Sequence, residues 1–266
     1  MKRNLLSLLI FVAITVVATA NGQDWKKLDQ LSASNKTQIQ LVQSDGNFIS
    51  LKFDFNAYKI NDVKTSKGIA QLIDIPNCTR TQEKGAPDLP KISQAIVVPD
   101  NAKMEINLSK SKYVELQNIN IAPSRGVMSR DKDITEYPYV FGSVYNVNAF
   151  YPKSIVSLQE PYVIRNVRGQ TVMVNPVQYN PVTKVVRIYT DMVVDIVSTG
   201  VDSKNTLSFN ANVKNDAVYD NVLKNHFINY ETSTKYTPIS EDGKKMLIDC
   251  HSSFMDEMAT FKNWKE

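Results

Sequence analysis

The chain has 266 residues, of which 42% are hydrophobic and 22% are charged, a composition typical of a folded globular protein and not of a disordered or fibrous one. Its 31 basic and 27 acidic residues give a formal net charge of +4, and no block of five or more like charges occurs. Because lysine and arginine are not clustered, we expect no nucleic-acid partner.

The first twenty residues have the pattern of a secretory signal peptide. Lys2 and Arg3 precede an apolar run over residues 5–17, and small residues follow at 18–20. The run is shorter than the roughly 20 apolar residues that a membrane-spanning helix needs, and no later segment comes close. We therefore expect residues 1–20 to be a signal peptide and the mature chain to be secreted or held at the cell surface, without a membrane span.

From about residue 38 to residue 197 the hydrophobic period is two, as expected for strands with one buried face. In "SLKFDFN" the residues Leu51, Phe53 and Phe55 alternate with polar ones. The longest unit, residues 169–197, is interpreted as a long β-hairpin that turns at Asn180-Pro181. Its second arm places one set of apolar residues on a single face, namely Val186, Ile188, Met192, Val194 and Ile196. These segments predict an all-β fold, an antiparallel β-sandwich.

Residues 198–243 lose this alternation and are polar, which is typical of loop or linker. A short helix is predicted within them, over about residues 216–227. Its histidine, His226, is expected at the surface or in a helix-capping role.

The pattern changes again near the C-terminus. Residues 245–250 form a short apolar segment that predicts a strand, and Ser253 begins a capping pattern for an amphipathic helix. A strand followed by such a helix is how an α/β domain begins. Since one strand and one helix cannot cover an α/β sheet, we interpret residues 236–266 as the start of a second, truncated domain.

Cys250 and His251 raise the question of a cysteine nucleophile with an adjacent base. Adjacent residues on a strand point to opposite faces, so a dyad is not favoured there. A small buried Cys250 and a loop His251 are the simpler interpretation. The other cysteine, Cys78, could pair with Cys250, but their spacing alone does not predict a disulfide.

Other catalytic motifs do not occur in the sequence: neither Gly-x-Ser-x-Gly, His-Glu-x-x-His nor Cys-x-x-Cys is present. With two histidines and two cysteines, a metal site would have to be mostly carboxylate, and no spacing suggests one. We expect no metal, no cofactor and no catalytic residue in this chain.

Five stretches resemble the N-terminal propeptide of gingipain-type cysteine endopeptidases, with the first strand of the catalytic domain attached. They are "KGAPDLPKISQAIVVPDNAK" (84–103), "IAPSRGVMSR" (121–130), "PYVFGSVYNVNAFYP" (138–152), "PYVIRNVRGQTVMVNPVQYNPVTKVVRIYTDM" (161–192) and "KYTPISEDGKKMLI" (235–248). The resemblance implies a β-sandwich that keeps the peptidase latent and assists its folding, followed by a caspase-like α/β domain. The catalytic histidine and cysteine would then lie downstream of residue 266.

The resemblance also implies how latency works. Gingipains cleave after arginine or lysine, and the propeptide presents a basic side chain to the specificity pocket of the enzyme. In the "IAPS-basic-G" motif that residue is Arg125, flanked by Pro123 and Gly126 as in an exposed turn. Arg130 is the alternative, and either residue could instead be an ordinary surface arginine.

The resemblance further implies that release requires a cut before the "YTP" motif, between Lys235 and Tyr236. Relatives often carry arginine at this position, so the lysine leaves open which specificity a processing protease needs. The expected organisation is a signal peptide (1–20), an inhibitory and chaperoning propeptide with its linker (21–235) and the start of a peptidase domain (236–266). The expected partners are the cognate catalytic domain and the processing protease. The alternative is an exported binding module for carbohydrate or a cell-surface partner.

Overall fold

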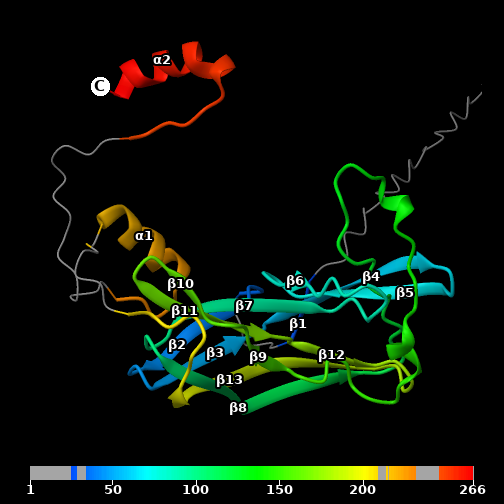
Figure 1. Ribbon diagram of the computed structural model, residues 1–266. Coiled ribbons are helices and arrows are strands. Elements are labelled where there is room, and N and C mark those ends of the chain that lie inside the picture. Colours follow the sequence, from blue (N-terminus) through cyan, green and yellow to red (C-terminus); the bar gives the residue numbers. More distant parts are fainter. Residues whose placement is uncertain (1–24, 29–33, 209–213, 215, 232–245, 266) are drawn as a thin grey trace, which may run out of the picture.

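The computed structural model describes residues 25–28, 34–208, 214, 216–231 and 246–265 (Figure 1). The strands are β1 (Lys26–Lys27), β2 (Gln38–Ser44), β3 (Phe48–Asp54), β4 (Ala57–Thr65), β5 (Gly68–Asp74), β6 (Thr79–Arg80), β7 (Pro90–Val97), β8 (Ala102–Leu116), β9 (Val156–Leu158), β10 (Tyr162–Ile164), β11 (Val167–Val174), β12 (Val177–Asn180) and β13 (Val185–Val201). The helices are α1 (Ala217–His226) and α2 (Met255–Lys265), and 3-10 turns form at Ile134–Glu136, Ser143–Asn146 and Ser252–Phe254. No helix among the described residues is long and apolar enough to cross a membrane.

Two five-stranded antiparallel sheets form the body of the molecule. One has the order β12-β13-β3-β2 with β8 paired to β13, and the other has the order β10-β11-β7-β6 with β9 paired to β11. Figure 1 shows the two sheets stacked, with a smaller sheet of β1, β4 and β5 at one end and α1 at the other. The predicted β-sandwich is confirmed.

The core lies between the two sheets because both contribute alternating apolar side chains. Leu51 and Phe53 of β3 are fully buried, as are Val172 and Val174 of β11 in the opposite sheet. All five apolar residues predicted on one face of β13 are fully buried. Burying one such side chain contributes about 1.5–3 kcal/mol, so this two-residue period fixes which face of each strand points inward.

The predicted long hairpin over residues 169–197 is only partly correct. Its turn and second arm are confirmed, since Asn180 pairs with Val185 at the closed end of a β12–β13 hairpin. The first arm is wrong: β11 pairs with β7 and β9 in the other sheet. The chain changes sheets at Asn175 and Pro176, where proline has no N–H to continue a ladder and Asn175 donates to Ile155 and Ser154 instead.

The short helix predicted near residues 216–227 is confirmed as α1. Asp216 caps its N-terminus by accepting a hydrogen bond from the N–H of Val218. At its other end the ring of Phe227 lies on β11, where a Cβ on Gly169 would come within 2.3 Å of the ring. Asn229 then bonds both backbone groups of Val97, at 2.7 and 3.0 Å, so this segment continues the sheet through side-chain hydrogen bonds.

The C-terminal prediction needs a correction. Residues 246–250 are extended but form no strand, because no neighbouring strand among the described residues pairs with them. A helix does follow, but His251 and not Ser253 occupies the capping position, before a 3-10 turn that leads into α2. None of the residues of α2 is buried.

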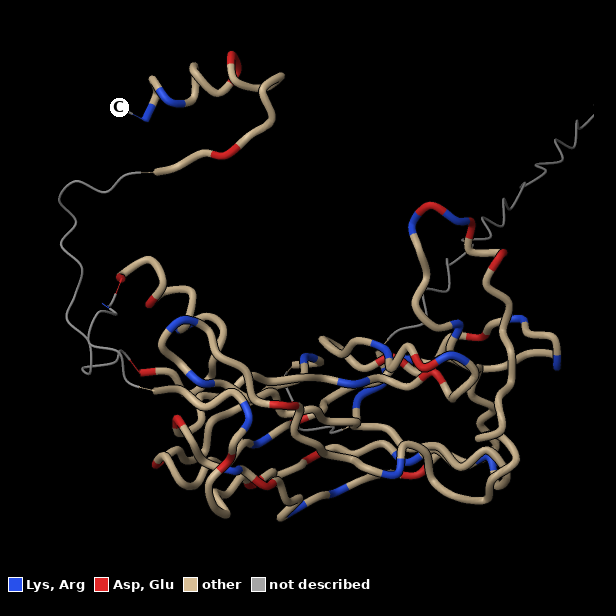
Figure 2. Tube along the Cα trace, in the orientation of Figure 1, with Lys and Arg blue, Asp and Glu red and all other residues tan. Residues whose placement is uncertain are grey.

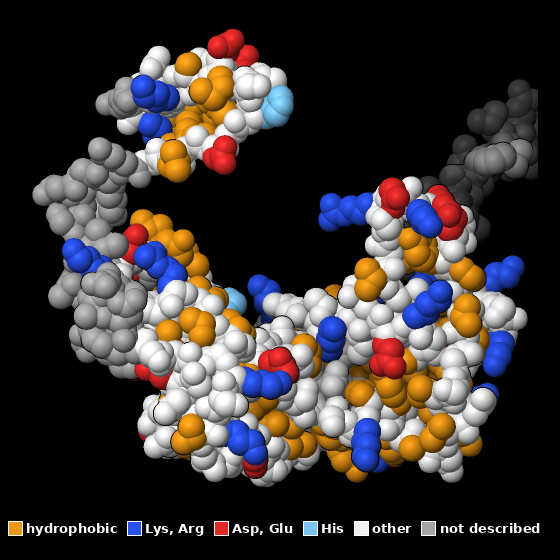
Figure 3. Space-filling model, in the orientation of Figure 1, with side chains coloured by type: hydrophobic (Ala, Val, Ile, Leu, Met, Phe, Trp, Pro, Cys, Tyr) orange, Lys and Arg blue, Asp and Glu red, His pale blue; other side chains and the backbone are white. Residues whose placement is uncertain are grey.

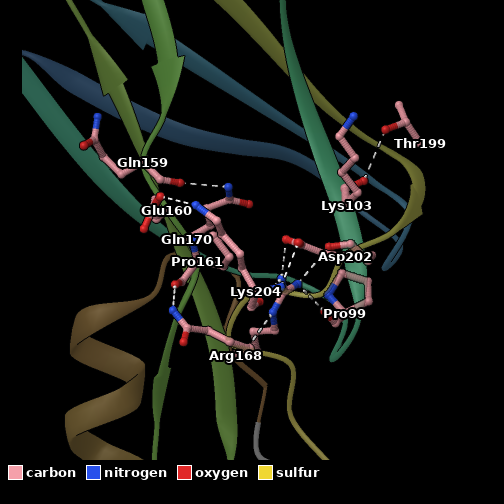
Figure 4. Close-up of polar contacts among 12 residues, drawn as sticks. Pro99, Lys103, Gln159, Glu160, Pro161, Arg168, Gln170, Thr199, Asp202 and Lys204 are labelled. Carbon is pink, nitrogen blue, oxygen red and sulfur yellow. Dashed lines mark hydrogen bonds and ion pairs between the residues drawn. The ribbon is translucent and has the colours of Figure 1, made fainter.

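A buried arginine ties three parts of the sandwich together (Figure 4). Arg168 on β11 has a fully buried side chain, and its guanidinium donates five hydrogen bonds of 2.8–3.0 Å. Two reach the turn between β7 and β8, and three reach the segment after β13. The acceptors are the carbonyls of Pro99, Ala102, Lys204 and Asn205 and the carboxylate of Asp202. The charge is thus paired and its donors are satisfied.

Arg168→Ala is expected to lower the free energy of unfolding by about 3–5 kcal/mol, because it removes the ion-pair partner of Asp202 and the hydrogen-bond donor to four carbonyls, of which that of Ala102 is buried. Urea denaturation measures the change. Lys103→Ala is the matched control, since Lys103 forms an exposed ion pair with Glu105 at 3.0 Å and should contribute at most about 1 kcal/mol. Equal effects of the two substitutions would contradict the structural role of Arg168.

Candidate functional site

The most prominent irregular segment is the 123–142 loop, which stands out from the end of the sandwich that carries β4 and β5 (Figure 1). Both ends of the loop are fixed on one segment. The N–H of Ser124 donates to Ala86 at 2.7 Å, and the N–H of Gly85 donates to Ser124 at 3.0 Å. At the far end the N–H of Gly142 donates to Gly85 at 2.9 Å. The loop therefore begins and ends at the same place.

The chain that leads into the loop is buried and bonded to β5. Gln71 accepts the N–H of Ala122 at 2.9 Å and donates its own N–H to Asn120 at 2.7 Å. The hydroxyl of Tyr145 donates to the carbonyl of Ile121 at 2.9 Å. Burial raises the pKa of Tyr145, so this phenol stays protonated and keeps its role as donor. The backbone before residue 125 is thus held from several sides.

An ion pair lies beside the base of the loop. The N–H of Asp88 donates to Ala122, and its carboxylate lies 3.4 Å from the guanidinium of Arg80, which also contacts Asp74. Burial raises the pKa of Asp88, and the nearby Arg80 only partly offsets this. One carboxylate oxygen of Asp88 is buried without a hydrogen-bond partner among the described residues.

Arg125 has a fixed backbone and a loosely held side chain. Gly126, at φ +85°, follows it in the left-handed region and donates its N–H to the hydroxyl of Ser124. The guanidinium carbon lies 4.0 Å from the ring centroid of Tyr139, and Nη1 donates to the carbonyl of Ile134 at 3.3 Å. Nε is buried and has no hydrogen-bond partner among the described residues. The side chain is half-buried.

The tip of the loop, residues 127–136, is exposed throughout. Its shape is set locally: Ser129 donates its N–H to the hydroxyl of Tyr137, and Asp133 and Glu136 form a reciprocal capping box. Hydrogen bonds from Thr135 lower the pKa of Asp133. Figure 2 shows basic and acidic residues alternating along this tip, and Figure 3 shows it projecting from the body.

Of the predicted site residues, Arg125 and Arg130 lie in this one loop but in different surroundings. Arg125 is half-buried at the base and Arg130 is exposed at the tip. Lys235 and Tyr236 lie outside the described residues, as do the predicted signal peptide and the predicted domain boundary. Sequence reasoning did not find Tyr139; the aromatic run "EYPYVF" just after the motif is the signal that could have drawn attention to it.

Cys250 and His251 do not form a catalytic pair. His251 bonds Ser253, with Nδ1 at 2.8 Å from its hydroxyl, whereas the sulfur of Cys250 lies 3.7 Å from that of Met255. Neither cysteine is in a disulfide. Cys78 is partly buried beside the core, and burial raises the pKa of its thiol to about 12.

Residues 30–237 match the sequence pattern of the family Propeptide_C25. The chain belongs to this family. The Propeptide_C25 chain is 36% identical over 231 residues to gingipain R2 of Porphyromonas gingivalis, an alignment that covers 86% of this chain and 31% of that protein. Gingipain R1 of the same species is 34% identical over 257 residues, with 96% and 25% covered. The chain spans about a third or less of the length of these relatives.

Solved structures show the same fold. The Propeptide_C25 chain is similar to a chain in the complex of Porphyromonas gingivalis RgpB pro- and mature domains, with a TM-score of 0.67 and 36% identity, covering 73% of this chain and 98% of that one. A structure concerning zymogenic latency of gingipain K from the same species has a TM-score of 0.56 at 21% identity, with 67% and 99% covered. The second likeness concerns the fold alone.

Gly126→Ala is expected to destabilise the base of the loop by about 1–2 kcal/mol because of its left-handed backbone, and a Cβ there would lie 3.1 Å from that of Lys84. Hydrogen exchange at the amides of Ser124 and Gly85 should become faster. Gly46→Ala is the control, since Gly46 has φ +86° and no atom within 4 Å of the added Cβ. Gly46→Ala should leave the exchange rates of those two amides unchanged. Unchanged exchange rates in Gly126→Ala would show that Gly126 does not hold the base of the loop.

The native chain is expected to have one fast-reacting thiol, Cys250, and one protected thiol, Cys78. With a pKa of about 12, only about one in ten thousand Cys78 thiols is ionised at pH 8, and the thiolate is the reactive form. Labelling with an aromatic disulfide reagent measures this, and unfolding in urea should expose both. Cys78→Ala should keep the fast phase; its loss would contradict the assignment.

Proposed function

We propose that the chain is the propeptide region of a gingipain-type cysteine endopeptidase precursor, which keeps the peptidase domain latent and assists its folding. The observation that carries this proposal is the 123–142 loop, with its rigid base and an arginine at the motif position. It is supported by membership in Propeptide_C25 and by likeness to a prodomain solved with its mature domain.

Arg125 is the residue that we propose enters the specificity pocket. On one side Ser124 is held by backbone hydrogen bonds, and on the other the N–H of Gly126 donates to the Ser124 hydroxyl, so presenting Arg125 to a partner requires little further ordering of the chain. A guanidinium can form a bidentate pair with a carboxylate in such a pocket. Arg130 has the greater exposure but lies on the tip, beyond the hydrogen bonds that fix the base.

We further propose that the precursor is exported by its signal peptide and that a protease cuts between Lys235 and Tyr236. Near the end of the described segment before this point, Asn229 bonds β7 of the sandwich at Val97, and the hydroxyl of Tyr230 donates to Asp220 of α1. A cut after residue 235 would thus follow a docked segment and leave that segment in place.

The full chain, added in trans, is expected to inhibit a gingipain R catalytic domain. Arg125→Ala should weaken inhibition about 30- to 1,000-fold, the range of a central arginine contact. The inhibition constant measures the effect.

Arg130→Ala is the matched control, because it removes the same charge from the same loop at an exposed position, and should change the constant less than about threefold. A larger loss of inhibition in Arg130→Ala than in Arg125→Ala would show that Arg130 is the residue that enters the specificity pocket. If the wild-type chain does not inhibit, the proposal as a whole is wrong.

A further inference from the structure

Two other arginines of the sandwich show how firmly such a side chain can be held. Arg168 donates five hydrogen bonds and pairs with Asp202. Arg187 lies between the rings of Tyr113 and Phe150, at 4.4 and 4.1 Å, and pairs with Glu115 at 2.8 Å. Each of these two side chains is thus paired with a carboxylate.

Arg125 is held much less firmly than either. It has one hydrogen bond of 3.3 Å to an uncharged carbonyl and one aromatic ring at 4.0 Å. No carboxylate among the described residues lies within ion-pair distance, and its Nε is buried without a partner. A buried N–H without an acceptor costs free energy, so this position of the side chain is a weak minimum.

We infer that Tyr139 is a positioning residue that holds the guanidinium of Arg125 in a parked position, from which it must rotate before it can bind a peptidase. This inference rests on the proposed function. In the parked position the guanidinium contacts Tyr139 and Ile134 within its own loop. Bidentate pairing with a carboxylate uses two N–H donors on one edge of the guanidinium, and that edge must be free. Binding to a partner and parking therefore compete for one side chain.

Only molecules whose Arg125 side chain is free can bind, so the apparent affinity is the intrinsic affinity multiplied by the fraction of such molecules. An exposed or half-exposed cation–π contact corresponds to a factor of about three to ten. Tyr139 thus tunes the inhibitor without contacting the peptidase.

Three variants test the inference. Tyr139→Leu keeps an apolar side chain but removes the aromatic face, so the inhibition constant for a gingipain R catalytic domain should fall about three- to tenfold. Tyr139→Phe retains the ring and should stay within about twofold of wild type. In an Arg125→Ala background, Tyr139→Leu should have no effect, because the cycle isolates the coupling between the two side chains.

A second measurement is independent of inhibition. In chain labelled with 15N-arginine, the Nε–H resonance of Arg125 should be shifted by the ring of Tyr139 in wild type and in Tyr139→Phe, and should lose that shift in Tyr139→Leu. Thermal unfolding of each variant shows that the loop and sandwich remain folded.

The outcomes separate the two proposals. Weaker inhibition by Tyr139→Leu would show that the ring pre-organises Arg125 for binding, and would overturn the parking role while the proposed function stands. An effect of Tyr139→Leu that persists without Arg125 would mean that Tyr139 contacts the peptidase directly, which also overturns it. No inhibition by the wild-type chain overturns both.

Discussion

The buried guanidinium of Arg168 is the contact on which the arrangement of the sandwich depends. Three segments distant in sequence meet at it: β11, the turn between β7 and β8, and the chain that leaves β13. Removing this charge from water is costly, and the cost is offset only because all five donors find acceptors (Figure 4). The same strand carries Gly169, which leaves room for Phe227 and so for the docking of α1. The adjacent residues Arg168 and Gly169 therefore determine both how the segments of the sandwich are joined and where α1 docks.

The sandwich and the proposed functional side chain are held by different kinds of interaction. A buried ion pair and a packed core stabilise the sandwich. The 123–142 loop is held by backbone hydrogen bonds at its base, and the side chain of Arg125 has one long hydrogen bond. A rigid backbone with a releasable side chain suits a group that has to be transferred to a partner. Ile121 is fully buried and accepts a hydrogen bond from the partly buried Tyr145, so the base of the loop is held by contacts that do not involve the side chain of Arg125.

Patterns that depend on near neighbours could be predicted from the sequence. The two-residue period of β3 and β13 and the short helix near residues 216–227 are local, and each is confirmed. Relations between distant residues could not be predicted in this way. The change of sheet at Pro176 depends on which strand β11 finds as a neighbour, and a strand over residues 246–250 would need a neighbour that the described chain does not supply. Arg168 looked like any other charge on an alternating strand, because its acceptors lie more than thirty positions away in sequence.

The separation of loop and linker determines what a cut after Lys235 could do. The base of the loop is bonded to residues 85 and 86 and to β5, and the segment before the linker is bonded to β7, at the opposite end of the same sandwich (Figure 1). No hydrogen bond among the described residues connects the two regions directly, so a cut would leave Arg125 in its place. The cut would change the effective concentration of the propeptide at the peptidase domain. The linker sets this concentration while the chain is continuous, and diffusion sets it afterwards. Under the proposed function, latency in the uncut precursor needs only modest intrinsic affinity, and the strength with which Tyr139 holds Arg125 then decides how readily the cut propeptide binds again after it dissociates.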